Sequence, residues 1–350
     1  MKITQVAVSV ALCGIAAFAG ADDGAQDEPY DSGWAFYADN DLFAFRNSDR
    51  DYTGGFSLTL AGRRASEAWW STDTLRAATD RLLGLDSLYA DRTISRHSVE
   101  IGVTVFTPGD IANPEPGDRP YASLLYLANT GVQVMPEREL AYISTFTMGV
   151  LGSPIVSSGQ KKIHRAIGAT EPAGWEHQIS NGGEPTFRYS FARVKHSWTG
   201  NLVGADGEMT STLYTSVGYL TEVTYGVATR IGQFSTPWWS YNPQIAEYAE
   251  KSVPVVASEG GGREHYFWGG VNLRVRAYNA FLQGQFRDSD VTFRASQLNP
   301  FLVEGWVGYT FASTNGWRLS YVLRALSPEV REGPANHTET WGGIVISHAL

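Results

Sequence analysis

The chain has 350 residues, a formal net charge of −9 at pH 7, and 27 basic against 36 acidic side chains. No stretch gathers basic residues into a stripe, so nucleic acid is excluded as an expected partner. Aromatic residues make up 13% of the chain, and there are 37 Gly. Two classes fit this composition: a large soluble β protein, or an outer-membrane β-barrel with aromatic girdles.

Residues 1–21 predict a secretory signal peptide. Lys2 precedes an apolar run over 6–19 that closes with small residues in an A-x-A pattern, and the run is too short to span a membrane. The alternative is a buried first helix. The single cysteine, Cys13, lies in this segment behind a residue too bulky for a lipoprotein signal. The domain at 22–350 therefore has no disulfide, which is typical of a bacterial envelope protein.

Segments of alternating apolar and polar residues follow. Alternation alone fits both a sandwich and a barrel, but the export signal, the aromatic content and the long segments favour a barrel that is apolar outside and polar inside. We predict an all-β fold, a transmembrane antiparallel up-and-down β-barrel of about 12 strands. The predicted strands are 33–41, 53–62, 98–106, 120–133, 139–151, 185–197, 207–222, 265–277, 279–287, 301–312, 317–326 and 338–350.

Strand parity assigns the connections to the two ends of the barrel. If the chain starts in the periplasm, every odd-to-even connection lies outside the cell. These connections are mostly long, whereas several of the inward ones are short, such as the turn at Asn315-Gly316. The predicted outer connections are 42–52, 107–119, 152–184, 223–264, 288–300 and 327–337.

One inward connection, 63–97, is long and contains leucines and tryptophans at helical spacing. We expect a short amphipathic helix that lies at the periplasmic rim or plugs the lumen. The alternative is a simple cover for the end of the barrel.

Unusual polar residues gather at the predicted outer end. The stretch "YADNDLFAF" (37–45) has alternating aromatic residues, yet it contains Asn40 and Asp41, which are poor strand residues. Thr53 begins the next predicted strand at the same end of the barrel. The third outer connection contains "GQKKIHRAIG" (159–168). Parity therefore predicts that Asn40, Asp41, Thr53 and the loop around His164 lie at one end.

Five motifs occur in a fixed order: "NDLFAF", "SDRDYTGGFSLTL", "TPGD…DRPYAS", "GVLGSP…Q…IH…GWEHQISN" and "YNAFLQGQFRDS". With these motifs the chain resembles the outer-membrane lipid A 3-O-deacylases (LpxR-like), over nearly all of 22–350. The resemblance implies a twelve-stranded barrel that removes an acyloxyacyl chain from lipid A with the help of Ca2+.

Ester hydrolysis needs a base, a nucleophile and a group that stabilises the oxyanion. Of the seven histidines, His164 is the candidate base, because it sits in a motif-bearing outer loop near the carboxylates at the strand end. The resemblance implies that it activates a water molecule. Its other possible role is to extend a basic loop, with Lys161, Lys162 and Arg165, over anionic lipid. The same three cations are candidates for binding the lipid A phosphates or core sugars.

Asn40 and Asp41 offer the hard oxygen ligands that calcium prefers, and the resemblance implies that they form a functional site. Asp41 either holds the metal or orients the histidine, and an Asx turn that ends the strand is the structural alternative. Thr53 matches a hydroxyl-bearing position of the family, which implies a hydrogen bond to substrate or to metal-bound water; a plain strand residue is the alternative. Gln160 is expected to line the pocket.

The sequence thus predicts a calcium-dependent lipid A 3′-O-deacylase of the bacterial outer membrane. We expect a monomer, with its site facing the outer leaflet and with lipopolysaccharide and outer-membrane lipids as partners. One alternative is an outer-membrane phospholipase with a Ser nucleophile, although no G-x-S-x-G motif occurs. The other is a non-catalytic, porin-like barrel.

Overall fold

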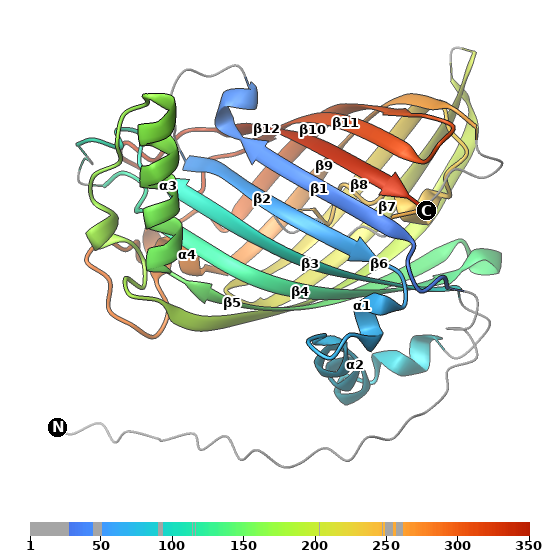
Figure 1. Ribbon diagram of the computed structural model, residues 1–350, viewed down its shortest axis with the longest axis horizontal. Helices are drawn as coiled ribbons and strands as arrows, with labels where there is room; N and C mark the ends of the chain where they lie inside the picture. Colours follow the sequence, from blue (N-terminus) through green and yellow to red (C-terminus); the bar gives the residue numbers. More distant parts are fainter. Residues whose placement is uncertain are drawn as a thin grey trace.

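The protein is a closed antiparallel β-barrel (Figure 1). The computed structural model describes residues 28–44, 51–89, 94–113, 115, 117–202, 204–246, 248, 255–256 and 262–350. The predicted signal peptide lies outside the described residues. The strands of the described chain are β1 (Gly33–Asn40), β2 (Asp51–Ala61), β3 (Ile94–Thr107), β4 (Ala122–Met135), β5 (Leu140–Leu151), β6 (Glu184–Leu202), β7 (Ala205–Gly218), β8 (Leu220–Gln233), β9 (Glu264–Asn279), β10 (Phe301–Ala312), β11 (Trp317–Leu326) and β12 (Glu339–Ala349).

Strands that are neighbours in sequence pair with one another, and β1 pairs with β12 to close the barrel. The predicted up-and-down barrel of twelve strands is confirmed. No helix in the described residues is long and apolar enough to cross a membrane. The helices are η2 (Asp41–Ala44), α1 (Arg64–Glu67), α2 (Asp73–Leu82), η3 (Leu85–Tyr89), η4 (Pro136–Arg138), α3 (Pro154–Ile167), η5 (Trp175–His177), η6 (Trp238–Ser240), α4 (Ala280–Gln283) and η8 (Ala295–Gln297).

Side chains alternate between the outside and the lumen, as predicted. On β10, Phe301, Val303 and Val307 are exposed on the outer face, whereas Glu304 and Thr310 are buried in the lumen. The same division holds on β2, β9 and β11. An apolar outer face with a polar interior is the reverse of a soluble protein and is typical of a barrel whose outer face contacts lipid.

Two of the predicted strands were wrong in their placement. The segment at 207–222 ends earlier, at Gly218, and a separate strand, β8, follows almost at once. The turn is tight because Gly218 adopts a positive φ of 139°, and because the Ser216 hydroxyl donates to the Leu220 carbonyl at 2.9 Å. The predicted strand at 279–287 does not exist, since β9 ends at Asn279.

Asn279 ends β9 by capping α4: its side-chain oxygen accepts from the Phe281 amide at 2.9 Å. The structure has one strand that was not predicted separately, β8, and lacks the strand predicted at 279–287, so the total is still twelve. The predicted outer connection at 223–264 is therefore wrong as well. The end of the barrel beside α3 is called the α3 end, and the other is called the opposite end (Figure 1). The chain between β8 and β9 starts from the opposite end.

The connection between β8 and β9 enters the lumen and fills it. The Gln244 side chain donates to the inward-facing hydroxyls of Thr210 and Thr212 at 3.0 and 2.7 Å. Its backbone carbonyl accepts from Asn272 at 2.9 Å. Further along, the ring of Tyr248 packs on Tyr52, with centroids 4.9 Å apart. This segment, not 63–97, forms the lumen plug.

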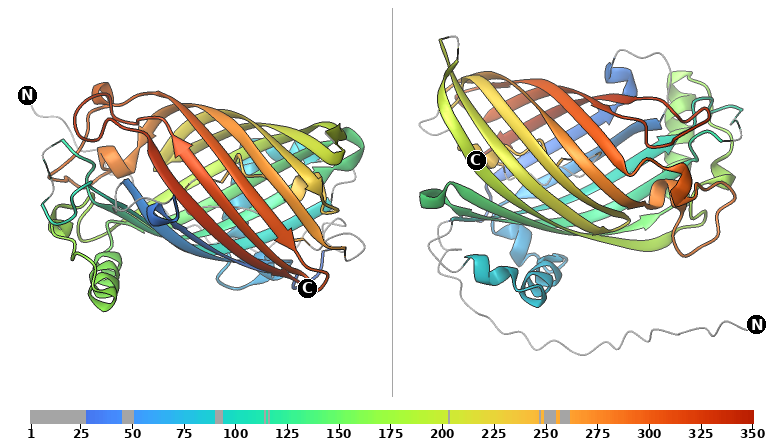
Figure 2. Two further views of the ribbon diagram at one scale, coloured as in Figure 1. Left: turned by 90° about the horizontal axis from the view of Figure 1, so that it is seen from above. Right: turned by 180° about the vertical axis from the view of Figure 1, so that it is seen from behind.

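The helix predicted in 63–97, at the rim or in the lumen, is present as α1 and α2, and of these two places the lumen is wrong. Both helices lie against the outer wall of the barrel, toward the opposite end (Figures 1 and 2). Asn129 and Ser144, from β4 and β5, hold them there through side-chain hydrogen bonds. The segment therefore covers part of the wall rather than the end of the barrel.

Buried ion pairs cross-link the lumen beneath the α3 end. Arg276, for example, contacts Glu222 at 2.8 Å and also contacts Glu329, so one cation joins β8, β9 and the connection after β11. All of these side chains are almost fully buried. Buried charges are tolerated only when each is paired, which makes this network a sensitive part of the fold. The pairs are Arg119–Glu329, Arg119–Glu339, Arg274–Glu222, Arg274–Glu304, Arg276–Glu222, Arg276–Glu329 and Arg324–Glu304.

Candidate functional site

The first part of the site is the end of β1. The Asn40 side-chain amide donates to the Thr53 carbonyl at 2.8 Å, and the Asn40 side-chain oxygen accepts from the Leu42 amide at 2.8 Å. The second bond is an Asx turn, the structural alternative considered for this residue. It turns the chain out of the strand and into η2, whose first residue, Asp41, is buried. The unusual polar residues in this strand therefore end it and leave a carboxylate at the rim.

Thr53 lies at a β-bulge, next to Gly54, the residue that pairs with Asn40. The pairing of β2 with β3 slips between Tyr52 and Gly54, so Thr53 is the extra residue. Its hydroxyl lies 2.5 Å from that of Thr107, the last residue of β3. A bulge re-aims a side chain and is common next to active sites. The sequence signal for Thr107 was its place in the "TPGD" motif, which by itself gave no role.

The second part of the site is α3. Ser153 caps its N-terminus, Pro154 follows as the first residue, and Gly168 ends it with a φ of 71°. Val156, Gln160 and His164 recur every four residues and are the less exposed side chains of the helix. Residues at this spacing lie on one helical face, and here that face is turned toward the protein.

His164 is 7% exposed, and its Nδ1 lies 2.6 Å from the Thr170 carbonyl oxygen. A carbonyl oxygen only accepts hydrogen bonds, so Nδ1 carries the proton in this contact. In the neutral ring the lone pair is then on Nε2. The chain thus fixes the tautomer of His164 and makes Nε2 its basic atom, which is the arrangement that a general base needs.

Gln160 holds the loop after α3. Its side-chain oxygen accepts from the Trp175 indole at 2.8 Å, and the Trp175 ring packs on Tyr121 with centroids 4.7 Å apart. The Tyr121 hydroxyl donates in turn to the Ile111 carbonyl at 2.7 Å. Gln160 thereby fastens α3 to the connection between β3 and β4, and its side chain positions the helix one turn before His164.

The three predicted substrate-binding cations differ in their surroundings. Arg165 is exposed and pairs with Glu171 through two hydrogen bonds of 3.0 and 2.9 Å. Lys162 is exposed and Lys161 is half-buried on the same helix. Because Glu171 offsets one of the positive charges, the loop is less basic than the sequence suggested.

A clasp joins the loop that carries α3 to the connection between β9 and β10. His177 Nδ1 lies 2.6 Å from an Asp290 carboxylate oxygen, and the Ser180 amide donates to the Ser289 hydroxyl at 2.9 Å. The hydrogen bond to Asp290 is the largest cause of a His177 pKa above its usual value. Protonated His177 and ionised Asp290 therefore attract one another across two loops.

The clasp predicts a pH dependence. Because the His177 pKa is raised, the attraction is complete below the ordinary pKa of about 6.5 and is lost as the pH rises through the raised value. An NMR titration of the His177 ring is expected to show the raised pKa, and Asp290→Asn is expected to lower it. The nearby exposed Asp288→Asn is the control. A His177 pKa that does not respond to Asp290→Asn would contradict this origin of the shift.

The structure brings Asn40 and Thr53 into direct contact, and Asp41 follows Asn40. His164 reaches the same end of the barrel from α3, which stands beside the ends of the first strands (Figure 1). The structure therefore places the four residues at the same end of the barrel.

A calcium ion suits the donor chemistry of Asn40 and Asp41. Both offer hard oxygen atoms, and the Asn40 oxygen, which accepts one hydrogen bond, keeps a second lone pair. The described residues contain no group of three or more His, Cys, Asp or Glu side chains arranged to hold a metal. Calcium takes six to eight oxygen ligands, so backbone, water or substrate oxygens would have to complete such a site.

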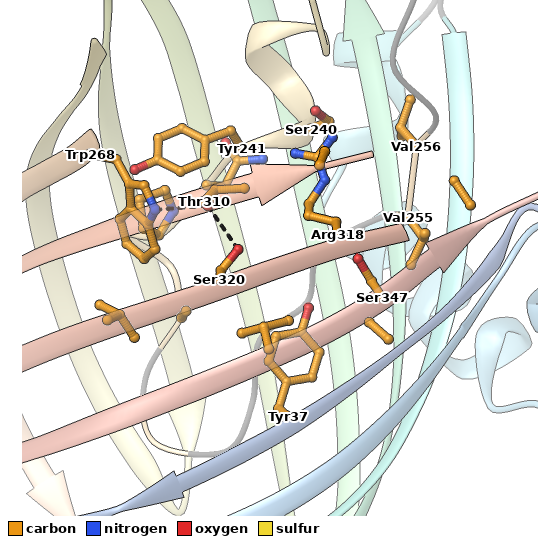
Figure 3. A pocket seen from close by; sticks show the side chains of 18 of the residues that line it. Tyr37, Ser240, Tyr241, Val255, Val256, Trp268, Thr310, Arg318, Ser320 and Ser347 are labelled. Atoms are coloured by element: carbon orange, nitrogen blue, oxygen red, sulfur yellow. Dashed lines mark hydrogen bonds between the residues drawn. The ribbon is translucent and has the colours of Figure 1, made fainter. Parts of the chain in front are cut away.

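A separate cavity of about 140 Å³ lies in the lumen. Tyr37, Tyr241, Trp268 and Arg318 line it, between the plug and the walls formed by β1 and β9 to β12 (Figure 3). Arg318 is paired there with Glu264 at 2.9 Å. None of the predicted site residues lines this cavity.

A closed barrel of twelve antiparallel strands with an apolar outer face and a charged, filled lumen defines an outer-membrane β-barrel protein. Comparison with protein families identifies the family of this barrel: the family model described as "Outer membrane protein LpxR" matches residues 6–350. The chain belongs to the LpxR family.

Solved structures to which the chain is similar include an LpxR protein and two autotransporter domains. LpxR from Salmonella typhimurium has a TM-score of 0.69 and 19% sequence identity, over 91% of this chain and 100% of that one. The β domain of the Bordetella autotransporter BrkA has a TM-score of 0.40 and 10% identity, over 92% and 100% of the two chains. The translocator domain of NalP from Neisseria meningitidis has a TM-score of 0.34 and 7% identity, over 94% of this chain and 91% of that one. No curated protein sequence matches significantly.

Proposed function

We propose that the protein is a calcium-dependent lipid A 3′-O-deacylase that hydrolyses the ester holding the 3′-acyloxyacyl chain. Membership of the LpxR family supports the substrate class. The observation that carries the mechanism is the His164–Thr170 hydrogen bond, because it makes Nε2 the basic nitrogen of a nearly buried histidine. In this proposal the protein acts as a monomer, and the α3 end faces the outer leaflet, where lipopolysaccharide resides.

The reaction begins with a water molecule at Nε2 of His164. As the water oxygen forms a bond to the ester carbonyl carbon, Nε2 takes its proton, and the Thr170 carbonyl stabilises the resulting imidazolium through Nδ1–H. The bond from the carbonyl carbon to the sugar oxygen then breaks. The proton passes from Nε2 to that oxygen, so the products are a free fatty acid and a sugar hydroxyl. His164 ends the cycle neutral.

Other residues of the site position the reactants. The Thr53 hydroxyl, re-aimed by the bulge and held near Thr107, is proposed to hydrogen-bond the substrate or the attacking water. Asp41 and Asn40 would hold a calcium ion, which when bound supplies positive charge to polarise the carbonyl and stabilise the oxyanion. Lys161 and Lys162 remain proposed contacts for lipid A phosphates, with Arg165 shared between that role and Glu171.

Calcium dependence is tested directly with purified protein and lipid A in detergent. Chelation is expected to abolish release of the acyl chain, and added Ca2+ is expected to restore it. Asp41→Asn removes a ligand charge, so it is expected to raise the Ca2+ concentration needed for half-maximal activity by tenfold or more. Full activity of the chelated wild type would contradict the proposed metal requirement.

Thr53→Val is expected to lower the deacylation rate about tenfold or more, because it removes a hydroxyl at the site while keeping the side-chain shape. The matched control is Thr310→Val, which breaks another buried hydroxyl pair, with Ser320 at 2.8 Å, deep in the barrel. Rates are compared by mass spectrometry of the released fatty acid. Equal rates for the two variants would show that the Thr53 hydroxyl has no part in the reaction.

The two alternative functions have less support. Ser153 caps α3 and the Ser157 hydroxyl donates to the Pro154 carbonyl, so these hydroxyls serve the helix. Labelling by a serine-directed phosphonate would favour the phospholipase. A porin needs an open lumen, whereas here the plug fills it in the described part of the chain. Steady conductance in planar bilayers without deacylation would favour the porin.

A further inference from the structure

The amphipathic helix on the outer wall is turned the wrong way for a soluble protein. In α2 the charged residues Arg76 and Asp80 are 5% and 3% exposed, whereas Leu82 is 84% exposed. Just before the helix, Trp69 is 94% exposed. Helices at a water-facing surface bury their apolar face and expose their charges. In α2 two charges face the wall and the leucines face outward, with Arg81 exposed beside them. An outward face of this composition fits a membrane interface, where leucine side chains meet acyl chains and an arginine reaches the water.

Arg76 fixes the polar face of α2 to the wall. Its guanidinium contacts Asp73 at 2.6 Å and Asp80 at 2.8 Å, and it donates to the Ser144 hydroxyl of β5 at 2.8 Å. A Cβ atom at Gly131 would come within 2.5 Å of the Arg76 guanidinium carbon. The glycine in β4 therefore makes room for the arginine.

A second attachment is made by Asn129 of β4. Its side-chain oxygen accepts from the Thr72 amide at 2.9 Å and from the Thr72 hydroxyl at 2.8 Å, and its amide donates to the Ala65 carbonyl at 2.8 Å. Asn129 thus supplies hydrogen-bond partners both to Thr72, at the start of α2, and to a backbone carbonyl of α1. Together with Ser144, it fixes the rotation of the helix about its own axis.

The wall residues that hold the helix belong to the lipid-facing side of the barrel. Side chains alternate along a strand, so Ser144 shares its face with Met148, which is exposed. Tyr189, which donates to Asp80, shares its face with the exposed Phe187. The apolar surface of the wall therefore continues onto the outward surface of α2 without an intervening charged strip on these strands.

We propose that α2 and its flanking residues, from Trp69 to Leu88, form a membrane-embedded segment whose outward apolar side chains insert among phospholipid acyl chains at the membrane interface of the opposite end. Two observations point to acyl chains as the occupant. The exposed apolar residues continue the lipid-facing surface of the barrel, and the buried charges Arg76 and Asp80 are already paired at the wall. The exposed apolar residues of the segment are Trp69, Trp70, Leu75, Leu82, Leu83 and Leu88.

The test uses single cysteines in the full chain, each in a Cys13→Ser background so that the label has one target. Leu82→Cys carries an environment-sensitive fluorophore on the proposed membrane face. Leu273→Cys, on the exposed outer face of β9, is the membrane control. Asn201→Cys, exposed near the tip of the hairpin between β6 and β7, is the water control. The labelled proteins are reconstituted in phosphatidylethanolamine–phosphatidylglycerol vesicles.

Phospholipids that carry a nitroxide near the headgroup are expected to quench the label at Leu82 at least threefold more strongly than the label at Asn201. Iodide in the buffer is expected to quench the two in the reverse order. Leu273 is expected to respond to a nitroxide deep in the acyl chain. A Leu82 label that behaves like the Asn201 label in both assays would overturn the proposal. Because Leu82 is exposed, its substitution leaves the packing of the barrel intact, and heat-modifiable migration on gels verifies folding.

Discussion

His164→Ala is expected to reduce lipid A deacylation by about 10²- to 10⁴-fold, the usual contribution of a general base. The reason is geometric: the Thr170 carbonyl fixes Nδ1–H, and no other atom of the helix face replaces the basic Nε2. Because the ring is on a helix that Gln160 and the Ser153 cap hold independently, the variant is expected to fold. The measurement is the initial rate of fatty acid release by the purified protein.

His265→Ala is the matched control for this variant, because His265 lies at the start of β9, at the opposite end of the barrel. Its rate is expected to equal that of the wild type. If His164→Ala retained more than about a tenth of the wild-type rate, the base would have to be another group.

Arg276→Met is expected to lower the free energy of unfolding by about 3–5 kcal/mol, the usual cost of breaking a buried ion pair from one side. Arg276 joins Glu222 and Glu329, and burial leaves neither carboxylate in contact with bulk water. Burial raises the pKa of Glu329, but Arg119 and Arg276 outweigh it and hold that pKa at about 2. The carboxylate therefore stays charged at neutral pH and is left with one cation in the variant.

Urea unfolding of the reconstituted barrel, followed by tryptophan fluorescence, measures this loss. Arg63→Met is the matched control, since Arg63 forms an exposed pair with Glu67 at 3.2 Å on the outer helix. Exposed pairs contribute about 0–1 kcal/mol, so the control is expected to unfold nearly as the wild type does. Equal unfolding midpoints for Arg276→Met and Arg63→Met would show that the lumen network does not stabilise the barrel.

The sequence predicted the barrel because one face of every strand contacts lipid and the other the lumen, which imposes alternation of period two. It did not place all the strands, because alternation runs through the turn at Gly218 without an Asn-Gly or similar signal. The helix α4 is short and follows β9 directly, so "AFLQ" reads as a continuation of the strand. The two errors cancelled in the count.

The positions of the lumen plug and of the outer helix could not be predicted, for a shared reason. Both are positioned by residues distant in sequence, such as Gln244 with Thr210 and Thr72 with Asn129. Helical spacing predicted that α2 has two faces, but which face meets the barrel depends on the polar partners that the wall offers. Only the folded barrel shows that Ser144 and Asn129 face outward.

For the candidate site, parity was sufficient to place Asn40, Thr53 and the loop of His164 at one end. An Asx turn at this strand end was the structural alternative, but the sequence did not predict that the Asn40 side-chain amide also bonds to the Thr53 carbonyl. Nor did it predict the bond from His164 to Thr170, because the return of the chain after Gly168 depends on the helix cap. Chemical roles that depend on tautomer and bulge geometry require the structure.

The central claim is tested most directly by mass spectrometry of lipid A from cells that express the protein with ample Ca2+. For the wild type, the account predicts that lipid A loses the mass of its 3′-acyloxyacyl group and gains a free hydroxyl. In cells that express His164→Ala at the same level, lipid A is expected to keep its full mass. An unchanged lipid A profile with correctly folded wild-type protein in the outer membrane would contradict the proposed function.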